Sequence, residues 1–589
     1  SGGGTLQINT GTTTYGGVIS GSGALTKTGA GTLLLSGTST TTGIFTVSNG
    51  VLQAAATNIL SSISALNMST SATATFNLNN NSQTVGTLSG GTSGTVGNIT
   101  LGSATLTVKQ TDNATYGGVI SGTGGLTLST LAVDTLTLSN TNTYTGATTI
   151  NGGTLHLTGT NAIFASSGVT LDTNGGANLS LGSVSQTIKS LSGGSAGGGH
   201  VFLEGGTLTI EQTSTTTYAG IISGSGGITK TGSGSLTLSG VSTYTGSTAI
   251  SAGTITAGVA NIFTNSSALT LSTSSAATFN LNNLSQTVAT LSGGTSGTVG
   301  NITLGSATLA VNQTGAGTYG GIISGTGGLT LSSLSTNVLT LSNTNTYTGA
   351  TTINGGTLRL NSTGTIATSS GVALANASGA TLDLNNNSKT INNLSGGGTT
   401  GGNVTLGSGT LTITQNSNNS YSGVISGSGG ISKAGTATLT LGGANAYTGP
   451  TAVTAGTLAA SGENVNTSSG IAISGGATLN VIPGTASVTK VTSNAGTINI
   501  TGRMTAANAI TGAGAINVNS GGTLTLATGG GTISNTITNN ASGNLAVAGT
   551  STLATNLQNN GNMSITGSLN MPTRTLSNAG TISISGQNS

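Results

Sequence analysis

Leucine, isoleucine and valine alternate with threonine and serine in short runs that recur along the chain. Clear examples are residues 32–36, 135–139, 235–239 and 338–342. Alternation with a period of two is typical of a β-strand with one buried face, and the glycines and asparagines between the runs favour turns. No apolar pattern with a period of 3.6 persists for three turns. The pattern therefore predicts short strands and almost no helix.

The tyrosines show that these strands belong to a longer repeat. All nine begin one of two motifs, Tyr-(Gly/Ala/Ser)-Gly-(Val/Ile)-Ile-Ser-Gly or Tyr-Thr-Gly. The first series is Tyr15, Tyr116, Tyr218, Tyr319 and Tyr421, and the second is Tyr144, Tyr244, Tyr347 and Tyr447. Neighbours within a series are spaced by 100 (244−144) to 103 (347−244), which is the mark of a repeat protein whose units stack on one another. Each tyrosine could stack on a sugar, but recurrence in every unit favours packing in a corner of the repeat.

The end of the chain indicates the size of one coil. Similar segments begin at Gly496, Gly514, Gly543, Gly561 and Gly580. Their spacings of 18 (514−496), 18 (561−543) and 19 (580−561) suit one coil of a right-handed parallel β-helix. With about 20 residues per coil, the chain would form about 29 coils in a rod about 140 Å long. We expect two regions: 1–460 with repeats of about 101 residues, and 461–589 with simpler coils.

A slower repeat, a double unit made of two such repeats, is also present. Lys27, Lys230 and Lys433 are spaced by 203 (230−27 and 433−230), while Leu128 and Leu331 stand at the matching positions of the units between them. A position that accepts both lysine and leucine is most simply an outward-facing one, where the lysine stem lies along the surface. We therefore expect these lysines to face solvent.

Asparagine-rich segments recur with the same repeat. They are residues 79–85, 282–288 and 385–391, with 185–188 as a shorter fourth copy. We expect their asparagines and threonines to form corners and ladders in which amides bond along the coil axis. The alternative is a surface that contacts glycans.

Composition narrows the possible functions. The chain has only 17 charged residues among 589, ten basic and seven acidic, so its surface must consist largely of threonine, serine, asparagine and glycine. The net charge of +3 is spread along the chain without a Lys/Arg cluster, so we expect no nucleic-acid partner. Cysteine is absent, which excludes disulfides and thiolate metal sites. No run approaches the ~18 apolar residues of a membrane-spanning helix, and residues 1–4 do not resemble a signal peptide.

Titratable residues that could converge in an active site are few. His156 matches Arg359 in the copy one double unit later, so we expect a plain surface position. His200 and Glu204 suggest a metal pair, but two ligands do not make a site and the other copies lack them. The sequence thus predicts no catalytic, cofactor-binding or metal-binding residues, and no cofactor.

Some β-helices are polysaccharide-degrading enzymes that use paired carboxylates. Five of the seven acids lie close together in the sequence: Asp112, Asp134, Asp172, Glu204 and Glu211. Asp112 and Asp134, with a spacing of 22 (134−112), are the nearest candidates for stacking on adjacent coils. An enzyme remains a remote alternative, and it predicts that Asp172 or Glu204 clusters with neighbours on adjacent coils.

The two tyrosine motifs, with the alternating run between them and a Gly-Thr-(Leu/Ile) segment after them, together form one long motif. This long motif resembles the passenger-associated transport repeat of bacterial autotransporters. Residues 218–232, 236–240, 244–246 and 253–255 show the resemblance best, and it covers roughly 1–460. The resemblance implies a secreted β-helical passenger that is exported through the outer membrane and folds coil by coil outside. The family's membrane barrel is expected in the precursor but is missing from this chain, which ends at Ser589. The resemblance supplies no catalytic residues.

Residues 4–8 and 580–584 both have the pattern of an ordinary coil, without a capping helix, proline or charge cluster. We therefore expect a non-enzymatic extracellular protein on the bacterial cell surface that stacks end to end into a surface or matrix fibre. The alternative is a monomeric adhesin that binds glycans or host surface proteins along one face.

Overall fold

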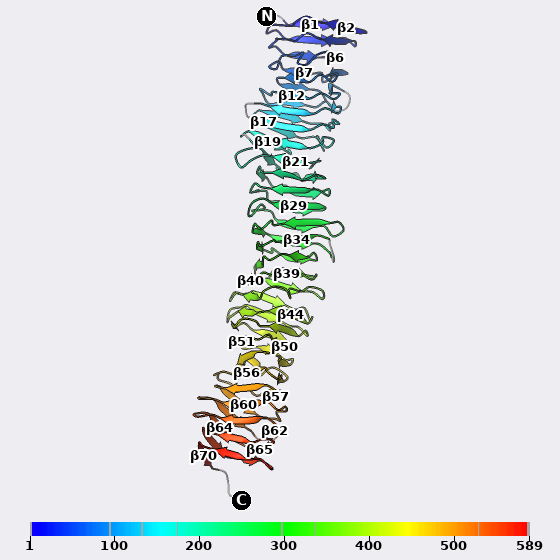
Figure 1. Cartoon of the computed structure of the whole chain (residues 1–589). Helices are drawn as coiled ribbons and strands as arrows, with labels where there is room; N and C mark the ends of the chain where they lie inside the picture. Colours follow the sequence, from blue (N-terminus) through cyan, green and yellow to red (C-terminus); the bar gives the residue numbers. More distant parts are fainter. Residues whose placement is uncertain are drawn as a thin grey trace. The chain divides into compact units, whose positions relative to one another are not determined.

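The computed structural model describes residues 3–92, 96–130, 134–173, 175–295, 299–334, 336–527, 529 and 531–585. The chain divides into two compact units, Ser1–Thr303 and Leu304–Ser589. Within each unit, short strands pair in parallel with the strands of the next coil (Figure 1). The strands stack as a β-solenoid of about 27 turns. This confirms the predicted all-β parallel solenoid.

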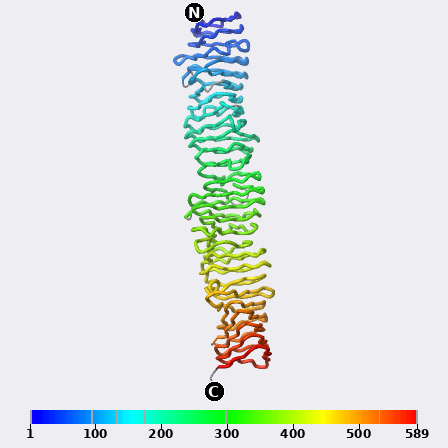
Figure 2. Tube along the Cα trace, turned by 90° about the vertical axis from the view of Figure 1, so that its left-hand side faces the viewer, coloured from blue at the N-terminus to red at the C-terminus, as the bar shows by residue number. Residues whose placement is uncertain are grey.

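Three consecutive coils of the first unit illustrate how strands are placed. Each coil has three strands, and each strand lies on a different sheet face. The first coil contains β8 (Ala74–Asn77), β9 (Gln83–Val85) and β10 (Leu88–Gly90), the next contains β11 (Asn98–Thr100), β12 (Leu106–Val108) and β13 (Ala114–Tyr116), and the third contains β14 (Ile120–Ser121), β15 (Leu126–Ser129) and β16 (Thr135–Leu138). Figure 2 shows the same succession of turns along the trace.

The core lies inside the coils because every second strand residue is apolar. Phe76, Ile99 and Ile120 occupy neighbouring positions on β8, β11 and β14, and all three are fully buried. The predicted alternating runs are strands β4 (Thr32–Leu35), β16, β27 (Ser235–Leu238) and β39 (Val338–Leu341). Burial of about 25 cal/mol per Å² of apolar surface drives this stacking.

Glycine allows coils to approach closely at one corner. A Cβ on Gly124 would lie 1.7 Å from the carbonyl oxygen of Ala104 in the preceding coil, and a Cβ on Gly226 would lie 1.8 Å from the carbonyl oxygen of Gly206. Any side chain would therefore force the two coils apart. This contact explains why the Ser-Gly-x-Gly-Gly segment is rich in glycine.

Coils of the second unit after residue 460 are the most regular. Thr497 pairs with Ala515, Asn544 with Asn562, and Asn562 with Thr581, which confirms the predicted spacings of 18 (515−497), 18 (562−544) and 19 (581−562). Earlier coils are longer; for example, Gly90 pairs with Tyr116, a spacing of 26 (116−90). This extra length explains why about 27 turns form rather than the predicted number near 29. The boundary at residue 460 stays a prediction.

Helix is almost absent, as predicted. In the described part of the chain the single helix is α1 (Gly462–Val465). No helix among these residues is long and apolar enough to cross a membrane.

Candidate binding clefts at the coil corners

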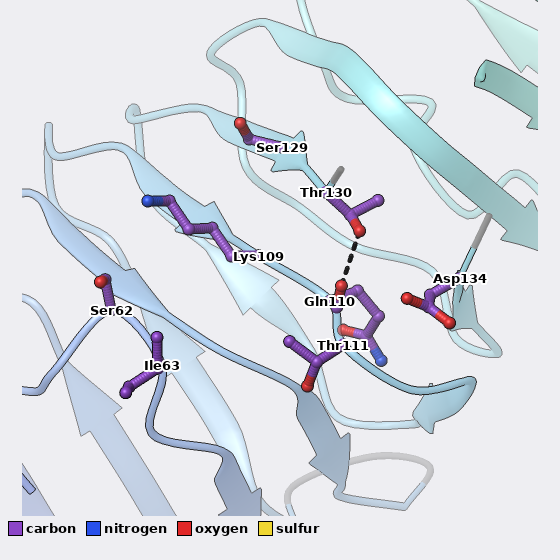
Figure 3. A pocket seen from close by; sticks show the side chains of 8 residues that line it. All are labelled: Ser62, Ile63, Lys109, Gln110, Thr111, Ser129, Thr130 and Asp134. Atoms are coloured by element: carbon purple, nitrogen blue, oxygen red, sulfur yellow. Dashed lines mark hydrogen bonds between the residues drawn. The ribbon is translucent and has the colours of Figure 1, made fainter. Parts of the chain in front are cut away.

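A cleft of about 320 Å³ opens at one corner of the first unit (Figure 3). Gly86 and Thr87 form a corner of only two residues between β9 and β10, and the coils on either side have wider corners. The short corner leaves a gap that the neighbouring coils line. We call it the first cleft, and its lining residues are Ser62, Ile63, Lys109, Gln110, Thr111, Ser129, Thr130 and Asp134.

The buried side chain of Gln110 lies between Lys109 and Asp134 in this cleft (Figure 3). Its Oε1 accepts a hydrogen bond from the backbone N–H of Leu88 at 3.2 Å. The hydroxyl of Thr130 donates to its backbone carbonyl at 2.7 Å. The amide nitrogen of Gln110 has no hydrogen-bond partner among the described residues. A buried donor without a partner costs about 1–3 kcal/mol.

The two charged groups of the first cleft are not ion-paired. Among the residues that the structure describes there are two ion pairs, Lys189–Glu211 and Arg359–Asp383. Lys109 is exposed, Asp134 is half-buried, and no hydrogen bond joins their side chains to another described group. The first cleft therefore offers a cation, an anion and an amide donor that no described group neutralises or satisfies.

A second cleft of about 520 Å³ lies at the equivalent corner of the following repeat. Lys189 and Glu211 line it and form an ion pair with each other. The Lys189 ammonium also lies 4.0 Å from the centre of the Phe164 ring. The Gln212 amide nitrogen donates to the carbonyl oxygen of Ser214 at 2.9 Å. The two charged groups of this second cleft and the Gln212 amide nitrogen are therefore already satisfied.

A third cleft of about 420 Å³ lies in the second unit, at the corner one double unit after the first cleft. Asn312 and Asn337 stand where the first cleft has Lys109 and Asp134, so this cleft has no charged residue. The amide of Asn337 is buried and donates to the backbone carbonyl of Gln313 at 2.7 Å. The asparagine side chain thus forms part of the scaffold and links two successive coils.

The lysines that recur once per double unit are buried, so the prediction that they face solvent is wrong. Lys27, Lys230 and Lys433 are all fully buried. The Lys230 ammonium donates to the carbonyl oxygens of Thr231 at 2.6 Å and Gly232 at 2.8 Å. Burial lowers the pKa of Lys230, and likewise that of Lys433, to about 8.

Corner length explains why leucine replaces lysine. Each lysine precedes the next strand at a spacing of 5, as from Lys230 to Ser235 (235−230), whereas the spacing from Leu128 to Thr135 is 7 (135−128). The tight corner turns its carbonyl groups inward, and the ammonium binds them. Ser129, Thr130 and Asp134, which follow Leu128, instead line the first cleft.

The tyrosines pack inside the corners, as predicted. Eight of them are fully buried, and Tyr15 is 45% exposed. Tyr144 donates to Thr148 at 2.6 Å, Thr148 to Ser166 at 2.9 Å, and Ser166 to the Gly146 carbonyl at 2.9 Å. The same relay recurs at Tyr244, Tyr347 and Tyr447. These buried rings cannot stack on a sugar.

The tyrosines of the first series, such as Tyr116 and Tyr218, each bind a loop of the preceding coil. Tyr116 donates to the carbonyl oxygen of Gly97 at 2.8 Å, and Tyr218 donates to that of Gly199 at 2.6 Å. Burial raises the pKa of these tyrosines well above the ordinary value near 10. Both series therefore serve the scaffold.

The asparagine segments form corners, as predicted. Asn79 and Asn80, like the pairs Asn282–Asn283 and Asn385–Asn386, have positive φ angles between 50° and 65°. Asparagine adopts this left-handed conformation more readily than most residues. The Oδ1 of Asn80 accepts from the backbone N–H of Ser103 in the next coil, so its amide bonds along the coil axis.

The histidines do not form a metal site with Glu204. The Nδ1 of His200 accepts the backbone N–H of Ile221 at 3.2 Å. Glu204 instead accepts the Ser180 hydroxyl at 2.6 Å, and Ser180 lies 2.8 Å from Nδ1 of His156. Because Ser180 has one proton and gives it to Glu204, Nδ1 of His156 must donate to Ser180. His156 lies on the outward face of β17 (Thr148–Leu157), as expected of a surface position, but its side chain is half-buried.

Apart from Glu204, which is joined to His156 through Ser180, the acids that lie close together in the sequence have separate environments. Asp112 is exposed before β13, and Asp134 lines the first cleft. Asp172 accepts the Thr173 hydroxyl at 3.4 Å, while Glu211 pairs with Lys189. Among the described residues, no group of three or more His, Cys, Asp and Glu side chains could hold a metal ion.

Comparisons with known proteins place the repeats in a family. A family model described as the passenger-associated-transport-repeat matches residues 25–54, 134–162, 228–257, 324–360, 404–427 and 431–460. The chain is 34% identical over 437 residues to the Adhesin BmaC autotransporter of Brucella suis biovar 1 (strain 1330). The match covers 69% of this chain and 12% of that relative, so the chain spans only a small part of the relative's length. No solved structure matches the chain.

Proposed function

The chain is a β-solenoid of the autotransporter-passenger type built on passenger-associated-transport-repeats, and from this premise we propose that it is a non-enzymatic adhesive segment displayed on the bacterial surface. The similarity to a protein named as an adhesin carries the proposal. His156 and Glu204 are joined through Ser180, but Asp134, Asp172 and Glu211 each lie in a different environment, and this supports a binding role rather than catalysis. The side of the solenoid, with its open clefts, would provide the contacts.

A bead assay tests adhesion. Beads coated with the purified chain are expected to bind cultured animal cells several-fold more than beads coated with the same chain after unfolding. Antibody against the chain should label intact, unpermeabilised bacteria that express the precursor. Equal binding of folded and unfolded chains would refute the adhesive function, and labelling only after permeabilisation would refute surface display.

End-to-end self-association into a surface or matrix fibre is a second proposal. The parallel pairing of successive coils supports it, since the same pairing between two chains would build a fibre. Val18 and Ile584, which are 60% and 74% exposed, lie on the first and last described coils, where such a contact would form. Electron microscopy should show filaments for the purified chain, and V18K or I584K should shorten them. Single particles at high concentration would count against assembly.

A further inference from the structure

The three clefts occupy equivalent corners, but their polar groups are used differently. In the second cleft, Lys189 is already paired with Glu211. In the third, the buried Asn337 bonds to the backbone of the preceding coil. In the first cleft, Lys109 and Asp134 have no ion-pair partner among the described residues. This contrast singles out the first cleft, because the structure does not use its charged groups.

A second observation comes from the floor of the same cleft. Gln110 and Gln212 both use their side-chain oxygen to accept a backbone N–H from the preceding coil. The Gln212 nitrogen has two further partners, Ser214 and Thr216. The Gln110 nitrogen has none in the described chain, although Gln110 is 1% exposed and lines the cleft. Such a donor requires an acceptor that the described protein does not supply, either a bound water or the oxygen of a ligand.

The groups of the first cleft define the chemistry of that ligand. Lys109 and Gln110 offer donors on one side, and Asp134 offers an acceptor on the other (Figure 3). Ser62 and Thr111 also line the cleft, the Thr111 hydroxyl lying 2.9 Å from that of Thr87, and the 58% exposed side chain of Ile63 adds apolar surface at the rim. A volume of about 320 Å³ is at the small end of ligand sites, which run from roughly 300 to 1,000 Å³.

We propose that the first cleft binds one residue of an acidic glycan, a sugar that carries a carboxylate. The Lys109 ammonium pairs with the sugar carboxylate, Asp134 accepts hydrogen bonds from sugar hydroxyls, and Ile63 packs against the apolar face of the ring. The side-chain amide of Gln110 donates a hydrogen bond to the sugar oxygen that lies deepest in the cleft. This inference rests on the proposed adhesive function, since it names the ligand class for one contact on the side of the solenoid.

Charge and composition favour an acidic sugar over other ligands. The cleft has one lysine and no aromatic side chain, so it lacks the basic groove and stacking surface that single-stranded nucleic acid requires. An apolar ligand would leave Lys109, Gln110 and Asp134 without partners in a desolvated contact. A polyhydroxylated ring with one carboxylate satisfies all three groups.

Two ligands that differ at a single carbon test the proposal. Calorimetry or ligand-observed NMR on the full chain compares methyl β-D-glucuronide with methyl β-D-glucoside, which has a CH₂OH group in place of the carboxylate. The chain is expected to bind the glucuronide about tenfold more tightly, as one charge-assisted hydrogen bond predicts. Equal affinities, or no binding of either sugar, would overturn the proposal.

Variants locate the site. K109Q should abolish the preference for the glucuronide, and D134N should weaken both sugars; both side chains lack a described partner, so the fold should be unaffected. N312A, at the position that matches Lys109 in the third cleft, is the matched control and should bind as the wild type does. Loss of sugar binding in N312A, or an unchanged preference in K109Q, would place the site elsewhere. Bead adhesion that persists without any sugar binding would leave the adhesin standing and reject the cleft.

Discussion

The coils before and after residue 460 satisfy their buried polar groups in different ways. The earlier coils use tyrosine relays such as Tyr347–Thr351–Ser369 and lysines bound to corner carbonyls. The later coils contain no tyrosine. Inside them Asn539 donates to Asn559 at 2.6 Å, and Asn559 donates to Asn578 at 2.6 Å, in a ladder of amides.

Coil length accounts for this difference. An amide ladder needs the same residue at the same place in successive coils, and the paired strands of the later coils repeat at spacings from 18 (515−497) to 21 (536−515). The spacings between paired strands of the earlier coils vary more widely, from 19 (155−136) to 26 (116−90). In coils of unequal length, carbonyl groups at the corners and loops are bound by the longer tyrosine and lysine side chains. Regular coils favour ladders, and irregular coils favour long polar side chains.

Alkaline pH should separate the two regions most strongly. Burial raises the pKa of Tyr447 to about 12 and that of the other buried tyrosines further above 10. A raised folded pKa stabilises the fold below pH 10, and this contribution is lost as the pH rises through the folded value. Each tyrosine should lose roughly 1.4 kcal/mol by pH 11. Hydrogen exchange between pH 9 and 11 should show loss of protection before residue 460, and equal loss after it would contradict the comparison.

The buried lysines should give the next largest effect. K230M removes the ammonium that binds the carbonyls of Thr231 and Gly232, and it should lower local stability by about 3 kcal/mol because buried acceptors lose their partner. The matched control is L331M, at the equivalent position of a wide corner, which should cost less than about 1.5 kcal/mol. Hydrogen exchange of the flanking strands measures both.

The lysine also has a pH signature. The folded pKa of Lys230 is about 8, below the ordinary value of 10.5, because burial disfavours the charged form. A depressed pKa means that the unfolded chain binds more protons between these values, so stability should rise from pH 8 towards 10.5. K230M should lose this rise locally, and an unchanged profile would contradict the burial of the ammonium.

The asparagine ladder should respond less, and only in the later coils. N559A leaves Asn539 without its amide partner and should cost about 2 kcal/mol. N517A is the control, because Asn517 lies in a half-exposed ladder with Asn499, where water replaces the lost bond; it should cost less than about 0.5 kcal/mol. Equal effects in thermal unfolding would show that burial does not set the strength of the ladder.

The repeated patterns in the sequence predicted the scaffold well. Alternating apolar residues placed strands such as Thr32–Leu35 correctly, and the spacing of Gly496 and Gly514 gave the coil interval, because both are local regularities. The burial of Lys230 was not predicted from the sequence because leucine stands at the matching position of other units. This variation was interpreted as typical of a position on the surface. The cause of the burial is the length of the next corner, which sets where the carbonyls point.

The first cleft could not be assembled from the sequence. Ile63, Lys109 and Asp134 come from three coils, and their meeting depends on the lengths of the coils between them. The prediction paired Asp134 with Asp112 by spacing, whereas the structure places Lys109 beside the same cleft. A site on a solenoid whose coils differ in length can therefore be predicted only when the pairing register of successive coils is known. A search for acids that are close together in the sequence does not supply that register.

The helix at the start of the later coils provides the smallest effect. Hydrogen bonds from the hydroxyls of Ser461 and Thr485 lower the pKa of Glu463 to about 2. A depressed carboxyl pKa stabilises the fold above pH 4.5, and the contribution is lost as the pH falls towards 2. Because Glu463 is partly exposed, screening should limit the effect to less than about 1 kcal/mol. E463Q should remove this acid sensitivity from the hydrogen exchange of residues 485–486, whereas E211Q, which breaks an exposed ion pair in the earlier coils, should leave it unchanged. An acid response that survives in E463Q would mean that another carboxyl group governs α1, and the contrast between the two regions would then not extend to their acid stability.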